Sequence, residues 1–178
     1  MTVTIRETTE TSVRVELRPG TGAGTIETGL PFFDHMLTAL ARYSGLDLDI
    51  SARGDLRHHV IEDVALTLGR AFKDAVPAGV ARYGSRTVPM DDALVQATVD
   101  IGGRPYYQGP LPNKLYDHWM RSFSDEARAT IHIVVLRGTD KHHIIEAAFK
   151  ALGFALRDAL VDTGATMSTK GRVSVRVE

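Results

Sequence analysis

The pattern HHxxE occurs twice in the sequence, as HHVIE at residues 58–62 and as HHIIE at residues 142–146. On a helix, the first histidine and the glutamate of each copy are four residues apart, so they lie on one face, one turn apart. Side chains placed in this way can chelate one metal ion. The spacing therefore predicts imidazole and carboxylate metal ligands in two separate parts of the chain.

The second histidine of each pair points away from the first. Successive residues of an α-helix are about 100° apart around its axis, because one turn holds 3.6 residues. The two histidines of a pair cannot easily share an ion, and we expect them to serve two different ions. A further histidine follows an aspartate upstream of each copy. The candidate ligands are then six imidazoles and two carboxylates: His35, His58, His59, Glu62, His118, His142, His143 and Glu146.

Eight ligands divided between two ions give four protein ligands each and leave positions for water or substrate. Nitrogen and oxygen ligands in six-coordinate geometry suit Mn²⁺, with Fe²⁺, Co²⁺ and Zn²⁺ as competitors. The chain has no cysteine, which excludes disulfides, thiolate metal sites and cysteine nucleophiles. Six of the seven histidines belong to this ligand set, and His132 lies outside it.

An internal duplication supports the metal interpretation. One HHxxE match is weak by itself, because a histidine pair on a helix is usually a surface or core feature. Here the segment from Phe33 aligns almost without gaps with the segment from Tyr116. Both contain an aspartate–histidine pair, an Arg-Gly dipeptide, the HHxxE pattern and a long amphipathic run. We expect one domain over residues 1–178, made of two repeats at approximately 1–90 and 91–178.

The same pattern predicts the elements that position these side chains. In each repeat a helix near Pro31 or Pro112 carries the aspartate–histidine pair, and an alternating strand and a long helix follow. Asp55 and Asp140 are expected to cap the long helices. The fold class is α+β, with two duplicated β/α half-domains forming a two-layer sandwich with pseudo-twofold symmetry. The predicted ranges are strands at 3–17 (broken), 46–52, 94–101, 130–136 and 172–177, and long helices at 56–74 and 141–160.

Composition excludes several classes of protein. The formal net charge is -1, so the chain lacks the basic excess that nucleic-acid binding usually requires. The first residues have no basic start followed by an apolar run, as a secretory signal would. No apolar stretch approaches the roughly 20 residues of a membrane span. We therefore expect a soluble cytoplasmic protein that binds neither nucleic acid nor a membrane.

Short motifs along the chain resemble those of the imidazoleglycerol-phosphate dehydratase family. FFDHML, HHVIEDVALTLG, GRP, HHIIEAAFKAL and STKG stand in that family's order, and the match runs from RETTET near the start to STKG. The resemblance implies a ribosomal-protein-S5-domain-2-like fold. It also implies a lyase that converts D-erythro-imidazole-glycerol phosphate to imidazole-acetol phosphate and water in histidine biosynthesis. Two Mn²⁺ per active site would be bound by the eight histidines and glutamates named above.

The resemblance further implies which residues contact the substrate. Glu10, in RETTET, would be the catalytic acid–base, and Arg82, Arg104, Ser168 and Lys170 would bind the phosphate. Guanidinium and ammonium groups suit a phosphate because they donate several charged hydrogen bonds. Without the family resemblance, Glu10 would be interpreted as a solvated charge on an edge strand, the arginines as surface cations and STKG as a turn.

Three positions depart from the usual family pattern. Ala39 and Tyr43 stand where many relatives have glutamine and histidine, and Asp92 stands where they usually have glutamate. None of the three is a predicted metal ligand. The departures therefore bear on a substrate or neighbouring contact rather than on the metal.

Assembly follows partly from the divergent histidines, because each needs a facing element to complete its site, and that element can belong to another subunit. The resemblance implies a homo-oligomeric shell of 24 subunits with active sites between subunits. Two other classes stay open. A non-catalytic, metal-bridged assembly or storage protein would need no phosphate-binding residues. A two-metal phosphoester hydrolase would normally bridge its ions with carboxylates, whereas this ligand set is mostly imidazole.

Overall fold

Two four-stranded sheets contain all the named strands of residues 1–165, the part of the chain that the computed structural model describes. In hydrogen-bonded order, the first sheet has β1 (Thr2–Glu7), β2 (Thr11–Pro19), β4 (Leu46–Gly54) and β3 (Ile26–Glu27). The second has β5 (Tyr83–Met90), β6 (Ala93–Asp100), β8 (Thr130–Arg137) and β7 (Tyr106–Gln108). In both sheets the last strand is parallel to its neighbour and the other pairs are antiparallel. The matching order and direction confirm the duplication.

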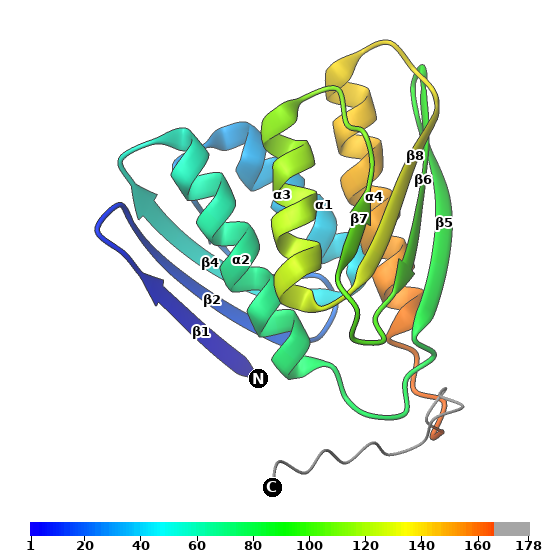
Figure 1. The fold of residues 1–178 in the computed structure, drawn as a ribbon, viewed down its shortest axis with the longest axis horizontal. Helices are drawn as coiled ribbons and strands as arrows, with labels where there is room; N and C mark the ends of the chain where they lie inside the picture. Colours follow the sequence, from blue (N-terminus) through cyan, green and yellow to red (C-terminus); the bar gives the residue numbers. More distant parts are fainter. Residues whose placement is uncertain (166–178) are drawn as a thin grey trace, which may run out of the picture.

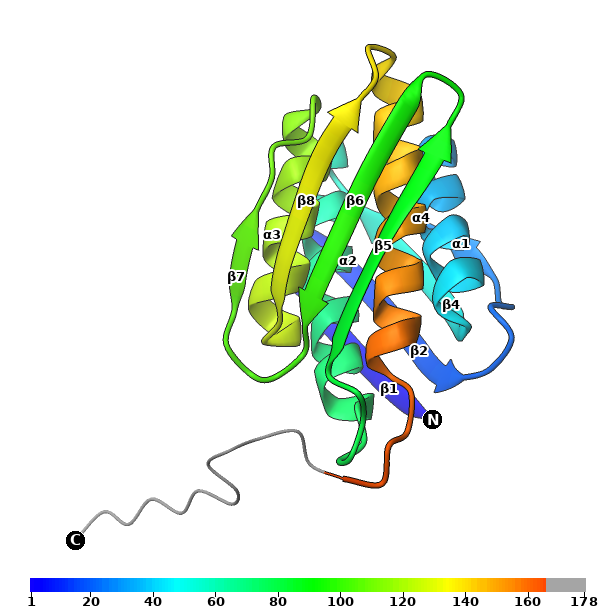
Figure 2. The ribbon, with the colours of Figure 1, turned by 90° about the vertical axis from the view of Figure 1, so that its right-hand side faces the viewer.

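The helices lie between the two sheets (Figures 1 and 2). The shorter pair is α1 (Pro31–Ser44) and α3 (Lys114–Ala127), and the longer pair is α2 (Arg57–Ala75) and α4 (Lys141–Ala159). Helix α2 packs on β1 and β2, and α4 packs on β5 and β6. Between the halves, α2 packs against α3 and α1 against α4. Each half is thus a two-layer β/α unit, as predicted, and the halves meet through their helices.

Alternating burial explains why the central strands form. Every second residue of β2 and β6 is buried, including Val13, Val15, Val95 and Val99, so one face of each sheet covers the helices. Aromatic side chains fill the helix layer, where the ring centroids of Trp119 and Phe149 lie 4.8 Å apart. The buried apolar residues of both halves form one continuous core.

Most predicted elements are confirmed, and the exceptions have local causes. The predicted strand at 3–17 is two strands joined by a turn at residues 8–10. Strand β5 was not predicted because its alternation is weak: Gly84 and Val88 are its only two buried residues. It pairs with β6, so the second repeat starts at β5, earlier than the boundary near residue 90. The strand predicted at residues 172–177 lies outside the described residues.

The two predicted helix caps have different outcomes. Asp140 caps α4, because its carboxylate accepts hydrogen bonds from the backbone N–H of His142 at 2.7 Å and of His143 at 3.4 Å. The prediction for Asp55 was wrong: Leu56 is the N-cap residue of α2, and no side chain accepts a capping bond there. Asp55 lies one residue further from its helix than Asp140 does, so its carboxylate bonds to His59 instead.

A glycine at the same repeat position brings each helix pair close together. A Cβ atom on Gly69 of α2 would lie 2.8 Å from the carbonyl oxygen of Phe123 on α3. On Gly153 of α4 it would lie 2.9 Å from Cβ of Tyr43 on α1. Both positions stand eleven residues after the first histidine of HHxxE. The missing side chains therefore allow the helix that carries one half's HHxxE pattern to approach the aspartate–histidine helix of the other half.

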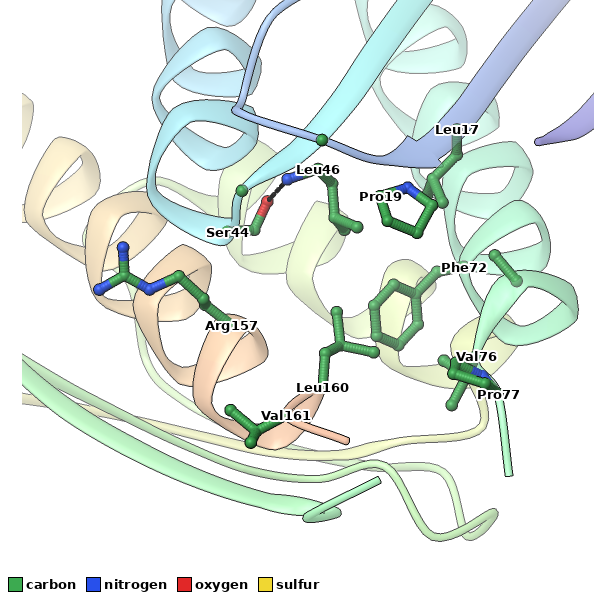
Figure 3. A pocket seen from close by; sticks show the side chains of 13 residues that line it. Leu17, Pro19, Ser44, Leu46, Phe72, Val76, Pro77, Arg157, Leu160 and Val161 are labelled. Carbon is green, nitrogen blue, oxygen red and sulfur yellow. Dashed lines mark hydrogen bonds between the residues drawn. The ribbon is translucent and has the colours of Figure 1, made fainter. Parts of the chain in front are cut away.

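A half-open apolar pocket of about 290 Å³ lies at the C-terminal ends of α2 and α4 (Figure 3). Leu17, Phe72 and Leu160 are among its lining residues, and Arg157 is the one charged side chain among the described residues that line it. The HHxxE residues are at the opposite, N-terminal ends of these helices. Among the helices of residues 1–165, none is both long enough and apolar enough to cross a membrane.

Candidate metal centre

The first group of candidate ligands joins the two halves of the chain. Glu62 of α2 lies 3.2 Å from Nε2 of His58 through Oε2 and 3.3 Å from Nε2 of His118 of α3 through Oε1. The imidazole rings of His58 and His118 are stacked, with centroids 5.4 Å apart. Donor atoms of the three residues all lie within 4.8 Å of one another. We call this group the first triad.

The first triad fits a divalent cation. Nε2 of His118 is buried and makes no hydrogen bond to any described residue. The carboxylate of Glu62, 3.3 Å away, does not make a hydrogen bond to it. A buried polar nitrogen without a hydrogen bond is costly, and a metal ion would satisfy it. Two imidazole nitrogens and a carboxylate are also the donor types that Mn²⁺ and its competitors bind.

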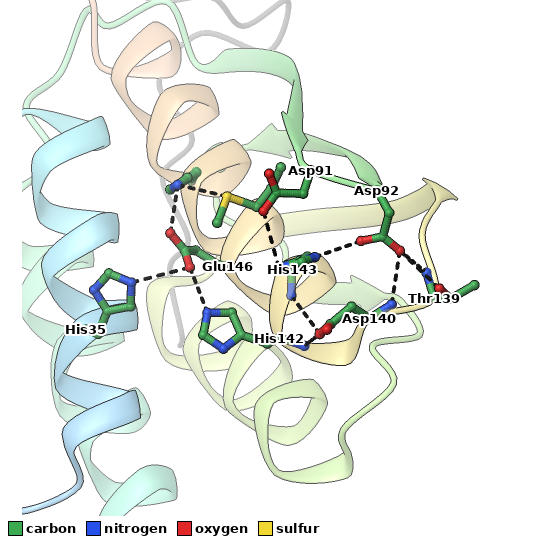
Figure 4. A network of polar contacts seen from close by, with 10 residues as sticks. His35, Asp91, Asp92, Thr139, Asp140, His142, His143 and Glu146 are labelled. Carbon is green, nitrogen blue, oxygen red and sulfur yellow. Dashed lines mark hydrogen bonds and ion pairs between the residues drawn. The ribbon is translucent and has the colours of Figure 1, made fainter.

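The second triad, His35, His142 and Glu146, has the same residue types with the halves exchanged, but it is less compact (Figure 4). Among the described residues, only the first triad brings donor atoms of all three of its members within 4.8 Å of one another. Oε2 of Glu146 lies 3.1 Å from Nε2 of His142, on the same helix α4, and 3.4 Å from Nε2 of His35 on α1. Each triad thus takes its HHxxE residues from one half and its single histidine from the other. The sequence alone did not show which aspartate–histidine helix faces which HHxxE helix, and the helix packing supplies the answer.

The other two histidines point away from the triads, as their spacing predicts. The rings of His58 and His59 are 5.9 Å apart and inclined by 73°, and those of His142 and His143 are 5.8 Å apart and inclined by 75°. Within one chain, therefore, neither ion would have the four protein ligands that the sequence predicts. Each triad has three ligands, and the outer histidines, His59 and His143, remain available to ions outside these groups.

Carboxylates hold the two outer histidines. Nδ1 of His59 lies 2.7 Å from Asp55 and 3.6 Å from Glu10. Nδ1 of His143 lies 2.8 Å from Asp92, in the turn between β5 and β6, and its Nε2 lies 3.3 Å from Asp91 (Figure 4). A carboxylate at Nδ1 favours the proton on that nitrogen and leaves the lone pair of Nε2 for a metal. The sequence had identified Asp92 only as a departure from the family pattern.

These hydrogen bonds shift the ionisation of both partners. The bond to Asp55 raises the pKa of His59, and the bond to Asp92 raises the pKa of His143. The bond to His59 lowers the pKa of Asp55. The pKa of Asp92 is also lowered, mainly by the backbone N–H of Thr139 and then by His143. Because an imidazolium has no free lone pair, an ion that binds either ring must displace a proton.

One basic residue of the second triad was missed by the sequence analysis. Nζ of Lys150, one turn after Glu146 on α4, lies 2.7 Å from Oε1 of that glutamate. Burial by itself would raise the pKa of Glu146, but Lys150 and the histidines outweigh it, and the pKa is lowered. Glu146 is therefore ionised and able to bind a cation. The spacing of four residues was the signal in the sequence.

Glu10 lies near the candidate ligands. The turn that carries it is held by Thr8, whose hydroxyl accepts hydrogen bonds from the backbone N–H of Glu10 at 3.1 Å and of Thr11 at 2.9 Å. The carboxylate of Glu10 is 54% exposed and is 3.6 Å from His59. Its position is thus compatible with a substrate held beside the outer histidine, and its catalytic role stays a prediction.

The predicted phosphate ligands lie at the other end of the molecule. Arg82 forms a two-point ion pair with Asp100, at 2.7 and 3.0 Å, and its backbone N–H donates to the carbonyl of Ala159 at the end of α4. At 1.5 Å per residue, that end is about 25 Å from His142. The carbonyl of Arg104 accepts a bond from Thr130, which pairs with Asp100 in the sheet. The structure therefore does not bring Arg82 or Arg104 to the triads of their own chain.

The last two predicted phosphate ligands, Ser168 and Lys170, lie outside the described residues. The other two departures from the family pattern lie on α1. Ala39 is buried in the core, and the ring of Tyr43 packs on Phe154 of α4, with centroids 4.8 Å apart. Tyr43 is thus part of the packing between α1 and α4.

Comparison with known proteins identifies one family. A family model described as imidazoleglycerol-phosphate dehydratase matches residues 28–156. The imidazoleglycerol-phosphate dehydratase of Pyrobaculum calidifontis is 50% identical, covering 93% of this chain and 96% of its own. That of Anaeromyxobacter sp. is 45% identical, covering 93% and 90%.

Solved structures agree with the sequence comparison. The crystal structure of IGPD from Pyrococcus furiosus has a TM-score of 0.86 to this chain at 42% identity, and it covers 95% of this chain and 99% of its own. The imidazoleglycerol-phosphate dehydratase of Staphylococcus aureus has a TM-score of 0.80 at 35% identity, covering 90% and 99%. At these identities the likeness extends beyond the fold to the family.

Proposed function

The chain belongs to the imidazoleglycerol-phosphate dehydratase family, and from this premise we propose that it dehydrates D-erythro-imidazole-glycerol phosphate to imidazole-acetol phosphate in histidine biosynthesis. The pair of crossed triads is the observation that carries the proposal, because it places two groups of candidate metal ligands where the family motifs stand. The reaction breaks one carbon–oxygen bond and one carbon–hydrogen bond, releasing water. It needs a group that favours loss of hydroxide and a base that accepts a carbon proton.

We assign the metal role to the two triads and the outer histidines, with Mn²⁺ as the ion. His58, Glu62 and His118 would hold one ion, and His35, His142 and Glu146 the other. When bound, such ions act as Lewis acids that polarise a substrate nitrogen or oxygen. Asp55 and Asp92 keep Nε2 of the outer histidines available by bonding to Nδ1. Glu10, near His59, is the proposed acid–base that carries a proton of the substrate.

The active site is proposed to lie between subunits of a cytoplasmic homo-oligomer, with 24 subunits as the family resemblance implies. Two features support this arrangement. Among the described residues, neither outer histidine belongs to a group of three closely spaced candidate ligands. Arg82 bonds to the C-terminal end of α4, which is about 25 Å from His142 at the N-terminal end of the same helix. The arginine end of one subunit would therefore bind the phosphate of a substrate held at the triads of another.

Metal-dependent turnover tests the proposed reaction. Protein treated with a chelator and then restored with Mn²⁺ is incubated with imidazole-glycerol phosphate, and the ketone product is measured. We expect product only after Mn²⁺ is restored. Absence of product with every divalent cation tried would end the dehydratase proposal.

Mixing two inactive variants tests the site between subunits. His118→Ala removes a triad ligand, and Arg104→Ala removes a phosphate ligand from the other end of the chain. At a substrate concentration near the KM of the unmodified protein, each variant alone is expected to have little turnover, and subunits dissociated, mixed and reassembled with Mn²⁺ should regain part of it. If both residues serve one site within a chain, mixing restores nothing.

The same arginine separates the lyase from a metal-bridged scaffold. In a lyase, Arg104→Ala raises KM for the phosphorylated substrate, whereas a storage or assembly protein keeps all its properties. Arg70→Ala is a matched control, because Arg70 is an exposed arginine of α2 paired with Asp74. An Arg104→Ala variant with the same KM as Arg70→Ala would exclude Arg104 from the phosphate site, and absence of turnover in the unmodified protein with Mn²⁺ would favour the scaffold.

A further inference from the structure

The glutamates of the two triads carry different partners. The side chain of Glu62 is 34% exposed, and each of its two oxygens contacts a different imidazole. The side chain of Glu146 is only 6% exposed, and both imidazoles contact the same oxygen, Oε2. Its other oxygen, Oε1, is bound by Lys150 at 2.7 Å. One triad therefore offers both carboxylate oxygens to an ion, and the other offers one.

Lys150 has no counterpart in the first repeat. Aligning HHVIEDVAL with HHIIEAAFK places Leu66 at the same position, one turn after the glutamate. In the second repeat the ammonium group of Lys150 is held on several sides. It is 3.4 Å from Sδ of Met90 and 5.7 Å from the ring centroid of Tyr43, and its side chain is 17% exposed. The lysine is thus a largely buried, well-located positive charge.

A positive charge at this place opposes a second cation. Charges near a buried carboxylate interact strongly, because little water separates and screens them. An ion bound by His35, His142 and Glu146 would lie on one side of the carboxylate, with the ammonium group on the other. The ion would meet repulsion from Lys150, and it would find half of the carboxylate already engaged. Among residues 1–165, the ion pairs of Glu62 are with histidines alone, so neither effect is present at the first triad.

Building on the proposed metal role, we propose that Lys150 makes the two ion sites unequal. The triad of Glu62 binds a divalent cation more tightly, and the triad of Glu146 binds it more weakly through a single carboxylate oxygen. Lys150 acts as a positioning residue: it fixes the orientation of Glu146 and lowers the affinity of that site. The two ions of each active site therefore load in sequence, with the first triad filled first.

Titration of the metal-free, full-length protein with Mn²⁺ tests this proposal. Calorimetry and the electron paramagnetic resonance signal of unbound Mn²⁺ give the number of sites and their affinities without any need for turnover. We expect two classes of site per chain, differing by about tenfold or more. His118→Ala should remove the tighter class, and His35→Ala should remove the weaker class.

Two substitutions at the equivalent positions of the repeats test whether Lys150 causes the difference in Mn²⁺ affinity. Lys150→Met keeps an unbranched side chain of similar length and should tighten the weaker class by about tenfold or more. Leu66→Lys places a lysine at the equivalent position of the first repeat and should weaken the tighter class. Thermal unfolding of each variant shows that the fold is retained. Together the two substitutions should reverse the order in which the triads fill.

Two results would overturn the proposal, and they differ in what else they remove. If the sites of the unmodified protein have one affinity, and Lys150→Met does not change it, the role of the lysine is refuted. The dehydratase proposal still stands in that case if the same sample forms the ketone. A protein that binds no Mn²⁺ would refute both. Tightening of the weaker class by Lys150→Met, with the tighter class unchanged, supports the proposal.

Discussion

In the first repeat, the outer histidine His59 is held by Asp55, which lies four residues before it on the same segment, whereas in the second repeat His143 is held by Asp92 from a hairpin turn. The inner triads differ far less: both place a histidine and a glutamate of one helix opposite a histidine of another. The types of ligand residue set by helix spacing have thus stayed equivalent between the repeats, and the acids that hold the outer histidines have not.

The hairpin turns explain how the outer acids came to differ. Three residues, ending in Glu10, join β1 to β2, and two, Asp91 and Asp92, join β5 to β6. The longer turn leaves Glu10 at 3.6 Å from His59, while the tighter turn brings Asp92 to 2.8 Å from His143. An acid from the hairpin therefore stands near the outer histidine in both repeats, and only in the second does it make the main contact.

Removing each triad glutamate gives the largest expected effect. Glu62→Gln and Glu146→Gln should each lower turnover by more than about 100-fold, beyond the loss usual for partners of metal ligands. The relative loss of Mn²⁺ affinity at the altered triad should be larger in Glu146→Gln, because Lys150 then has no carboxylate beside it. Steady-state kinetics and Mn²⁺ titration measure both effects. Equal retention of metal by the two variants would contradict the difference between the triads.

Filling the two helix crossings tests whether the halves pack alike. Gly69→Val and Gly153→Val place side chains against backbone and Cβ atoms of the facing helix, so each should lower the free energy of unfolding by about 1–3 kcal/mol. Denaturant unfolding measures the loss, and exposed Lys73→Val on α2 is the control. Similar losses at both glycines are expected. A loss confined to one of them would show that the crossings are not equivalent.

Removing the outer acids should have a smaller and unequal effect. Asp92→Asn should raise the Mn²⁺ concentration needed for half-maximal turnover by about 10- to 100-fold, because the ring of His143 loses the carboxylate that orients it. Asp55→Asn should cost less, since Glu10 remains near His59. Asp92→Glu restores the carboxylate and should recover most of the loss. Failure of the glutamate to do so would indicate that the turn itself, rather than its charge, matters.

The smallest expected effect is a pH dependence of stability in metal-free protein. The pKa values of His59 and His143 are raised above the ordinary 6.5, so folding favours their protonated forms. This contribution is fully present below pH 6.5 and is lost as the pH rises through the higher pKa of the folded state. Thermal unfolding at several pH values measures it. Asp92→Asn should make the slope shallower, and an unchanged slope would exclude His143 as its source.

Much of the candidate site could be predicted because its signals are local and occur twice. HHxxE places a histidine and a glutamate on one helical face by spacing alone, and the repeat of that pattern near aspartate–histidine pairs identified all six triad residues. Asp140 as a helix cap was predictable for the same reason. The weak alternation of β5 and the offset of Asp55 by one residue were not, because neither leaves a clear local pattern.

The sequence by itself determined which side chains could bind a metal and in which direction adjacent histidines would diverge, since both follow from the 3.6-residue period of one helix. Only the tertiary structure decided that His118 faces Glu62 and His35 faces Glu146, because helices of different halves meet across Gly69 and Gly153. It also decided that Asp92 lies beside His143. Such contacts depend on how distant segments pack, and no spacing within one segment encodes them.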